Sequence, residues 1–376
     1  MKERSQEPVL VVLQLSGGND FMNTLIPYSS GDYYDARPTV AIPQEDVLPI
    51  DDSLGFHPSA GPLKELYDRG KMAIVQGIGY PNSNRSHFRA MDIWHTCEPH
   101  EVGTEGWVAK AVRELDPRSE NVLTCVSLGK GLPRAVVASG VPVTSVDNLE
   151  AYGVMTGIAE EERLEALEIF KHMYTPAVGA QATMGYLGNT GLDVLKGTDM
   201  LKKAPAEYES DVEYANNGIA KSLRDVARIH LADLGTRIFY TQHGGYDTHS
   251  RELLLHEQLM TELSGAVMDF YQDLEAHDAG DNVAILVFTE FGRRIRDNGS
   301  GTDHGSGGGA FIIGPRVKGG LYAEYPPVDP ASWLNGEDLR HTVDFRGIYG
   351  TMLEQWIGID AGPIVGGNFE QVHPFA

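Results

Sequence analysis

The stretch VFTEFGRRIRDNGSGTDHGSGGGAFIIG places acidic and imidazole side chains between two apolar runs. Glu290 follows the first run directly, and Asp303 and His304 lie in the glycine-rich loop that leads into the second. A carboxylate at the end of a buried run must be paired, ligated or at the edge of the fold, because burying a lone charge is costly. Glu290 therefore either pairs with Arg293 or Arg294, or joins the aspartate and the histidine as a metal ligand.

Polar clusters also follow three other apolar runs, in the motifs SGGND, YPNSNRSHF and HGGYDTHS. They supply, in chain order, Asp20; Arg85, Ser86 and His87; and Asp247 and His249. Each cluster alone has a structural explanation, because Asp20 and Ser86 are of the types that cap helix N-termini and the other residues suit a polar loop. Ligands of open α/β sheets, however, bind beyond the carboxyl ends of the strands. The recurrence at four strand ends predicts a carboxylate and imidazole metal site.

The elements that would position these clusters can be predicted from the apolar runs. Runs rich in β-branched residues, without alternation, occur at residues 9–15, 72–79, 122–129, 237–242, 283–289 and 310–314. Such runs are typical of strands buried on both faces of a mostly parallel sheet. Helical patterns lie between them, at residues 60–70, 86–96 and 251–277. We therefore expect a three-layer α/β sandwich in a single domain over residues 1–376, with a helical insertion or cap at residues 158–235.

The amino-acid composition excludes some classes of binding partner. The formal net charge of −23 argues against a nucleic-acid or anionic-membrane surface, since both need clustered Lys and Arg. No run approaches about 18 apolar residues, so we expect no membrane span. The two cysteines, Cys97 and Cys125, allow one disulfide at most. The N-terminal residues show no export signal, which predicts a cytoplasmic protein for the sequence as given, or a periplasmic one if the chain is a trimmed form.

Six motifs together resemble the bacterial family known as domain of unknown function 1501, in the alkaline phosphatase and sulfatase superfamily. They are LQLSGGNDFMNTLIPY, RSHFRAMDIWHT, GGYDTHS, VFTEFGRR, GTDHGSGGGAFIIGPRVKGGLY and DFRGIYGTMLEQWIG, and they cover nearly the whole chain. The resemblance implies the alkaline phosphatase type of α/β fold.

The resemblance also implies roles for individual residues. Asp20 resembles the metal-binding aspartate after the first strand, and Ser86 resembles the nucleophile at a helix start. Asp247 and His249 resemble the later aspartate and histidine ligands of one metal, although one residue separates them here where the superfamily commonly has three. His304 resembles the final histidine ligand.

Two alignments with the superfamily motif remain open for the strand end that carries Glu290. In one, Glu290 and Phe291 replace the aspartate and histidine of the superfamily's Asp-His-Gly motif. In the other, Asp303 and His304 form that motif, and Glu290 is an additional ligand. Loss of a ligand at Phe291 implies one metal ion instead of two, or no catalysis.

The function implied by the resemblance is metal-dependent hydrolysis of a small anionic ester, of phosphate or related sulfate type. One or two divalent cations, zinc or manganese, would activate Ser86, and Arg85 and His87 would stand beside it at the helix start. A sulfatase is the weaker form of this prediction, because CEPHE has Glu101 where the modified-cysteine motif requires arginine. The alternative is a catalytically altered member that binds a ligand or a partner. The sequence does not predict the oligomeric state.

Overall fold

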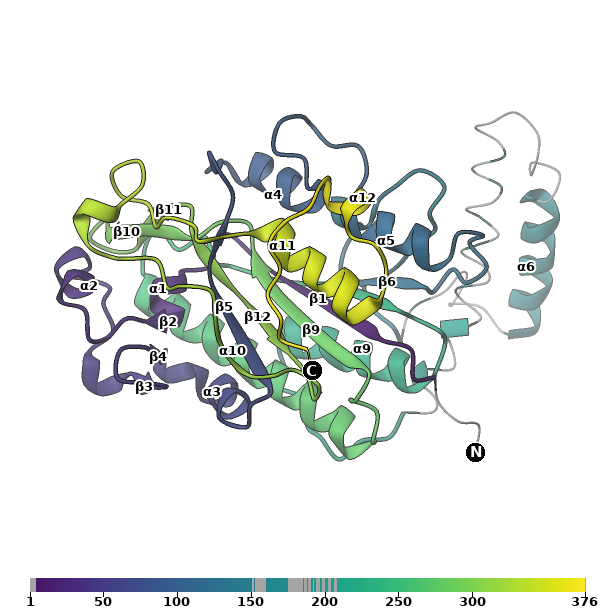
Figure 1. Cartoon of the computed structure of the whole chain (residues 1–376). Helices are drawn as coiled ribbons and strands as arrows, with labels where there is room; N and C mark the ends of the chain where they lie inside the picture. The colour runs from purple at the N-terminus through teal and green to yellow at the C-terminus, as the bar shows by residue number, and fades with distance from the viewer. Residues whose placement is uncertain are drawn as a thin grey trace.

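In this computed structural model a nine-stranded sheet runs through the molecule between two layers of helices (Figure 1). The structure describes residues 5–150, 152, 160–174, 185, 188, 191, 193, 197, 200–201, 204–205 and 208–375. The strand order is β13-β5-β12-β9-β1-β8-β6-β7, and β14 also pairs with β5. The strands are β1 (Val9–Ser16), β5 (Met72–Gly79), β6 (Cys125–Leu128), β7 (Thr144–Val146), β8 (Ile238–Gly244), β9 (Val283–Thr289), β12 (Gly308–Ile313), β13 (Gly320–Tyr322) and β14 (Val343–Asp344).

The central strands are buried on both faces, as their unbroken apolar sequences predict. Along β1, Val11 and Leu13 face one apolar cluster, and Leu10 and Val12 face the other. The first cluster is covered by α3 (Gly61–Asp68), α9 (Gly218–Leu231) and α10 (Glu252–Ala276), and the second by α4 (His87–Thr96), α5 (Trp107–Leu115), α11 (Phe345–Gly350) and α12 (Gly362–Val365). The predicted three-layer α/β sandwich is confirmed.

Strand direction is parallel throughout the large sheet except at β12, which runs antiparallel to both β5 and β9. Between β9 and β12 the chain forms a separate antiparallel pair of strands, β10 (Arg293–Asp297) and β11 (Thr302–His304). The predicted strands at residues 72–79 and 283–289 match β5 and β9, while β6 is shorter than the run at residues 122–129.

Smaller elements surround the sheet. A three-stranded sheet of β2 (Leu25–Ile26), β3 (Leu48–Pro49) and β4 (Gly55–Phe56) lies beside α1 (Phe21–Thr24) and α2 (Gly31–Ala36) in Figure 1. Short 3₁₀ turns cover Gln44–Asp46, Pro58–Ala60, Arg134–Val136 and Pro330–Ser332, and a π-helical turn, Thr351–Ile357, continues α11.

The segment predicted as an insertion contains α6 (Glu160–Tyr174) and α9. α9 packs against α10 and β8, so this part of the segment belongs to a layer of the sandwich. Residues 153–159 and 175–184 lie outside the described residues, and the single-domain organisation with a cap stays a prediction.

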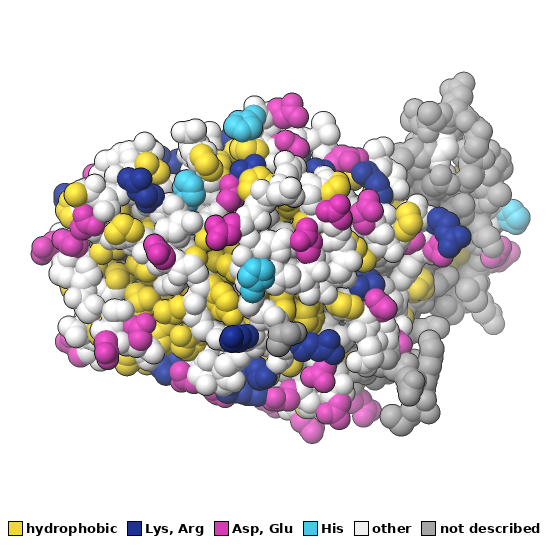
Figure 2. Space-filling view, viewed as in Figure 1, with side chains coloured by type: hydrophobic (Ala, Val, Ile, Leu, Met, Phe, Trp, Pro, Cys, Tyr) yellow, Lys and Arg dark blue, Asp and Glu magenta, His cyan; other side chains and the backbone are white. Residues whose placement is uncertain are grey.

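Cys97 and Cys125 are both free and buried, so the disulfide that the sequence allowed is not formed. Within the described ranges, no helix combines the length and the apolar character needed to cross a bilayer. Acidic side chains are scattered over the face shown in Figure 2, as the net charge of −23 predicts.

Candidate metal centre

The four predicted polar clusters follow strands of the large sheet. β8 and β9 are the two parallel neighbours of β1, and Leu15 near the end of β1 is in register with His243 and Thr289. The loops that leave these three strands therefore begin side by side. The remaining cluster, with Arg85, Ser86 and His87, follows β5 and leads into the start of α4.

Two glycines allow the loop after β1 to lie against its neighbours. A Cβ added at Gly17 would lie 2.4 Å from the backbone nitrogen of Asp247, and one at Gly18 would lie 2.4 Å from the Phe291 ring. Both glycines have positive φ, 123° and 78°, which other residues rarely adopt. The Gly17 amide donates to Glu290 Oε1 at 2.9 Å. The SGGND motif thus joins the ends of β1, β8 and β9.

Asp247 lies at the centre of three histidines. Its Oδ1 is 2.9 Å from His304 Nε2 and 3.1 Å from His249 Nε2, and its Oδ2 is 3.4 Å from His87 Nε2. The Nε2 atoms of His249 and His304 are 2.9 Å apart. One potential ligand atom each from His87, Asp247 and His304 lies within 4.8 Å of the others. We call the four side chains of His87, Asp247, His249 and His304 the Asp247 centre.

The second ring nitrogen of each histidine faces a hydrogen-bond acceptor. The Nδ1 contacts are His87 with Glu290 Oε1 at 3.0 Å, His249 with Asp303 Oδ1 at 2.9 Å, and His304 with the Arg85 carbonyl oxygen at 2.8 Å. In a neutral imidazole the nitrogen that faces an acceptor carries the proton, so the other nitrogen presents its lone pair. With the proton on Nδ1 in all three rings, the Nε2 lone pairs would be free to bind a cation beside the Asp247 carboxylate. Without a cation, His304 Nε2 lies 2.9 Å from Asp247 Oδ1 and donates to it when it carries the proton.

This arrangement fits a divalent cation. Imidazole lone pairs and carboxylate oxygens repel each other unless a proton or a cation lies between them. His87 Nε2 is shielded from solvent and makes no hydrogen bond. A carboxylate or carbonyl behind each imidazole is the support that metal-binding histidines commonly have. The donor types suit zinc and also manganese.

The protonation of the centre follows from its contacts. The hydrogen bond to Glu290 raises the pKa of His87 above its ordinary value, and burial opposes this rise. Burial by itself raises the pKa of Asp247, but bonds from Arg293 and His304 outweigh it and hold that pKa below the ordinary value. Asp247 is therefore ionised at neutral pH.

Arg293 bonds both to Asp247 and to the backbone around the centre. Its fully buried guanidinium donates to Asp247 Oδ1 at 2.8 Å. It also donates to four backbone carbonyls, those of Gly17, Gly18, Tyr246 and Thr302. The sequence suggested Arg293 only as a partner of Glu290, and its spacing from Asp247 carries no signal for this contact. Glu290 forms neither ion pair of the structural alternative, because Arg293 bonds to Asp247 at 2.8 Å and Arg294 bonds to Glu337 at 2.7 Å.

Phe291 closes one side of the centre. Its ring centroid lies 4.9 Å from that of His87 and 4.9 Å from that of His304, and the residue is almost fully buried. An apolar ring against two of the imidazoles leaves no ligand on that side.

Asp20 has other partners. Its Oδ2 lies 2.5 Å from Arg37 Nη1 in a buried ion pair, and its Oδ1 accepts from the amides of Met22 at 3.1 Å and Asn23 at 3.4 Å, which caps α1. Burial raises its pKa, but Arg37 outweighs this and the pKa is lowered. Among the described residues, no hydrogen bond or ion pair joins Asp20 to the Asp247 centre. Its role as a ligand stays a prediction.

Ser86 lies at the edge of the centre. It precedes α4 and is exposed, and its hydroxyl makes no capping bond to the helix. Its neighbours in the chain both reach the centre, Arg85 through its carbonyl and His87 through its ring. The Arg85 guanidinium lies 3.6 Å from Asp338 Oδ2. The structural explanation of Ser86 as a cap is thus not supported by a bond.

The structure brings together most of the predicted site residues. Asp247, His249 and His304 lie in the centre, and His87, predicted as a catalytic residue, joins them. Glu290 and Asp303, predicted as ligands, bond to the Nδ1 atoms of His87 and His249. Sequence periodicity gives no indication of which carboxylates bind directly and which support an imidazole.

The comparisons with known proteins give weak structural likenesses. A protein of the alkaline phosphatase superfamily from Vibrio parahaemolyticus is 10% identical to this chain, with a TM-score of 0.41. The match covers 100% of this chain and 72% of the Vibrio chain. The PsFucS1 sulfatase from Pseudoalteromonas sp. is 10% identical, with a TM-score of 0.42, and the match covers 97% of this chain and 70% of the sulfatase chain. A putative sulfatase from Bacteroides thetaiotaomicron has 11% identity and a TM-score of 0.39, with 98% and 77% covered. Likenesses at this level carry no functional argument.

No curated protein sequence matches the chain. A family model does match, over residues 155–360, and its description is protein of unknown function (DUF1501). The matched residues are more than half of the 376 in the chain. The protein therefore belongs to the DUF1501 family.

Proposed function

We propose that this protein is a metal-dependent hydrolase of phosphate or related sulfate esters. The observation that carries the proposal is the convergence of three histidine Nε2 atoms on Asp247, with the exposed residue Ser86 directly before His87 in the chain. Three imidazole nitrogens gathered on one carboxylate beside an exposed serine, with His87 Nε2 lacking a hydrogen-bond partner, favour chemistry at an anionic ester over a purely structural cluster.

His87, His249, His304 and Asp247 would hold the cation. Glu290, Asp303 and the Arg85 carbonyl keep the three imidazoles in the orientation that presents Nε2. A bound divalent cation lowers the pKa of a nearby hydroxyl and offsets negative charge that develops on a transferring group. Zinc is our first choice for a centre rich in imidazole, and manganese is the second.

Ser86 would act as the nucleophile. Its hydroxyl is exposed and not engaged in capping, and its side chain begins at the N-terminus of the ten-residue α4. The free amides of the first helical turn and the helix dipole favour an anion at this position. Arg85 adds positive charge beside it, which a protein of net charge −23 needs in order to attract an anionic substrate.

One arrangement favours a second function, the binding of a ligand or partner without turnover. Asp20, which the superfamily resemblance assigned as a ligand, is neutralised by Arg37, and Phe291 excludes a ligand next to two of the histidines. A centre with fewer ligands than the superfamily pattern can hold a cation and an anionic ligand while lacking the second charge that hydrolysis needs.

Substitution of Ser86 tests the proposal. Purified full chain is loaded with zinc or manganese and assayed with 4-nitrophenyl phosphate, bis(4-nitrophenyl) phosphate and 4-nitrophenyl sulfate. Ser86→Ala and Ser86→Gly are both expected to lower kcat by several orders of magnitude and to retain the metal, because the proposed ligands are untouched. The melting temperature should change little, since the hydroxyl caps nothing.

Ser83→Ala in the same loop is the matched control and should keep wild-type turnover. Unchanged hydrolysis in Ser86→Gly would remove Ser86 as the nucleophile. Absence of hydrolysis of all three esters by the metal-loaded wild type would favour the binding function instead.

A further inference from the structure

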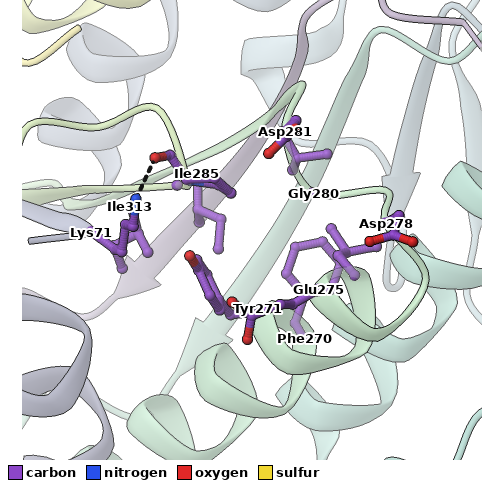
Figure 3. A pocket seen from close by; sticks show the side chains of 13 residues that line it. Lys71, Phe270, Tyr271, Glu275, Asp278, Gly280, Asp281, Ile285 and Ile313 are labelled. Carbon is purple, nitrogen blue, oxygen red and sulfur yellow. Dashed lines mark hydrogen bonds between the residues drawn. The ribbon is translucent and has the colours of Figure 1, made fainter. Parts of the chain in front are cut away.

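A cavity lies at the opposite end of the sheet from the Asp247 centre. It has a volume of about 300 Å³ and lies between the C-terminal part of α10, the start of β9 and the end of β12 (Figure 3). Val283 and Ile285 at the start of β9 line it, whereas Glu290 follows the end of that strand. At about 3.3 Å per residue, the two sites are on the order of 20 Å apart.

The inner wall of this cavity is apolar. Besides Tyr271, its buried lining residues from the helix and the sheet are Phe270, Leu274, Val283, Ile285 and Ile313. A cavity of this size with apolar walls suits a small hydrophobic group, and a few polar groups at its edge would fix the orientation of the ligand.

Tyr271 provides one polar group inside the cavity. The residue is only 6% exposed, and in Figure 3 its ring rises from α10 with the hydroxyl directed toward the strands that form the opposite wall. In the described part of the chain, this hydroxyl has no hydrogen-bond partner. The hydroxyl is not among the side-chain atoms shielded from solvent, so it is open to a hydrogen bond from a ligand that enters the cavity.

The charges at the mouth select the type of ligand. Lys71 Nζ donates to the Pro315 carbonyl at 2.8 Å, and Glu275 is paired with Arg69 at 2.6 Å. Asp278 and Asp281 are exposed at the mouth and have no hydrogen bond or ion pair from their carboxylates among the described residues. Lys71 keeps its positive charge, and Arg69 lies 5.0 Å from the centre of the Tyr271 ring. The three carboxylates of Glu275, Asp278 and Asp281 outnumber these two cations, so the mouth has a net negative charge.

We propose that this cavity binds a small amphiphilic cation, an amine with an aromatic or branched apolar body. The apolar body lies against Phe270 and Ile285, and the ammonium group faces Asp278 and Asp281. The Tyr271 hydroxyl accepts a hydrogen bond from the same ammonium group. This binding is separate from the proposed hydrolysis, so either can fail without the other.

Titration of the full chain with 2-phenylethylamine, followed by calorimetry or ligand-observed NMR, tests this inference. Wild type should bind the amine more tightly than the matched neutral 2-phenylethanol and the anionic 3-phenylpropionate. Replacing each carboxylate, in Asp278→Asn and Asp281→Asn, should weaken amine binding about two- to fivefold. Tyr271→Phe should weaken it about two- to tenfold.

Asp52→Asn, at an exposed acid outside the cavity lining, is the control and should leave amine binding unchanged. Melting temperatures of all variants report whether each one folds. Equal affinity for the amine and the neutral alcohol would overturn the proposal. So would the absence of amine binding, or full wild-type affinity in both Tyr271→Phe and the Asp278→Asn, Asp281→Asn double variant.

Discussion

Each imidazole of the Asp247 centre has one nitrogen bonded to an acceptor and the other directed at the carboxylate. The supporting acceptors are of two kinds, since Glu290 and Asp303 are charged and the Arg85 carbonyl is neutral. Charged acceptors raise the basicity of the imidazole that they support and fix its orientation. Glu290 and Asp303, which were predicted as ligands, therefore have a positioning role in our account.

Glu290→Gln tests this positioning role. The amide keeps the size of the side chain and removes the charge behind His87, so we expect metal affinity to fall about 10- to 100-fold with the fold intact. Competition with a chelator of known affinity measures the change. Glu337→Gln, at a half-exposed ion pair with Arg294, is the control and should keep wild-type affinity. A complete loss of metal in Glu290→Gln would instead indicate that Glu290 is a direct ligand.

At the scale of elements, α4 carries two histidines with opposite surroundings. His87 at its start meets two carboxylates, whereas His95 near its end lies in the apolar layer between α4 and the sheet. His95 Nε2 is 2.8 Å from Gln14 Oε1 of β1, and the Tyr240 hydroxyl of β8 is also within hydrogen-bond distance. One helix thus connects the Asp247 centre to a buried polar contact inside the sandwich.

The burial of His95 makes stability depend on pH. Burial lowers the pKa of His95 from 6.5 to about 4. The unfolded chain therefore takes up a proton at a higher pH than the folded one. The contribution of His95 to stability is complete above pH 6.5 and is lost as the pH falls toward 4. Full loss corresponds to at most about 3 kcal/mol.

Urea unfolding at a series of pH values measures this dependence. His95→Gln should be less stable than wild type at pH 7.5, and its free energy of unfolding should fall less between pH 6.5 and 4. His57 and His256 are also buried, with pKa values lowered to about 3 and about 4, so part of the dependence remains in the variant. An identical fall in variant and wild type would show that His95 does not contribute.

At the scale of the whole molecule, the layered fold could be predicted because its evidence is local. Unbroken apolar runs identified the strands from Val9, Met72 and Val283, and the four strand ends identified the edge where His87, Asp247 and His304 meet. The antiparallel direction of β12 could not be predicted, since a strand buried on both faces has the same sequence pattern in either direction.

Contacts between distant side chains could not be predicted either. Asp20 meets Arg37 because of the path of the chain around α1 and α2, and Arg293 reaches Asp247 across the ends of three strands. Neither spacing carries a periodic signal. The cavity around Tyr271 was also missed, because its apolar lining residues resemble ordinary core residues in the sequence.

The most direct test of the central claim is the metal content of the purified full chain after dialysis against micromolar free zinc or manganese. Our account predicts that wild type retains about one cation per chain. It also predicts that His304→Ala and Asp247→Asn retain far less, while the exposed control His373→Ala retains as much as wild type. Absence of retained metal in wild type, or equal retention in wild type and in both centre variants, would contradict the account.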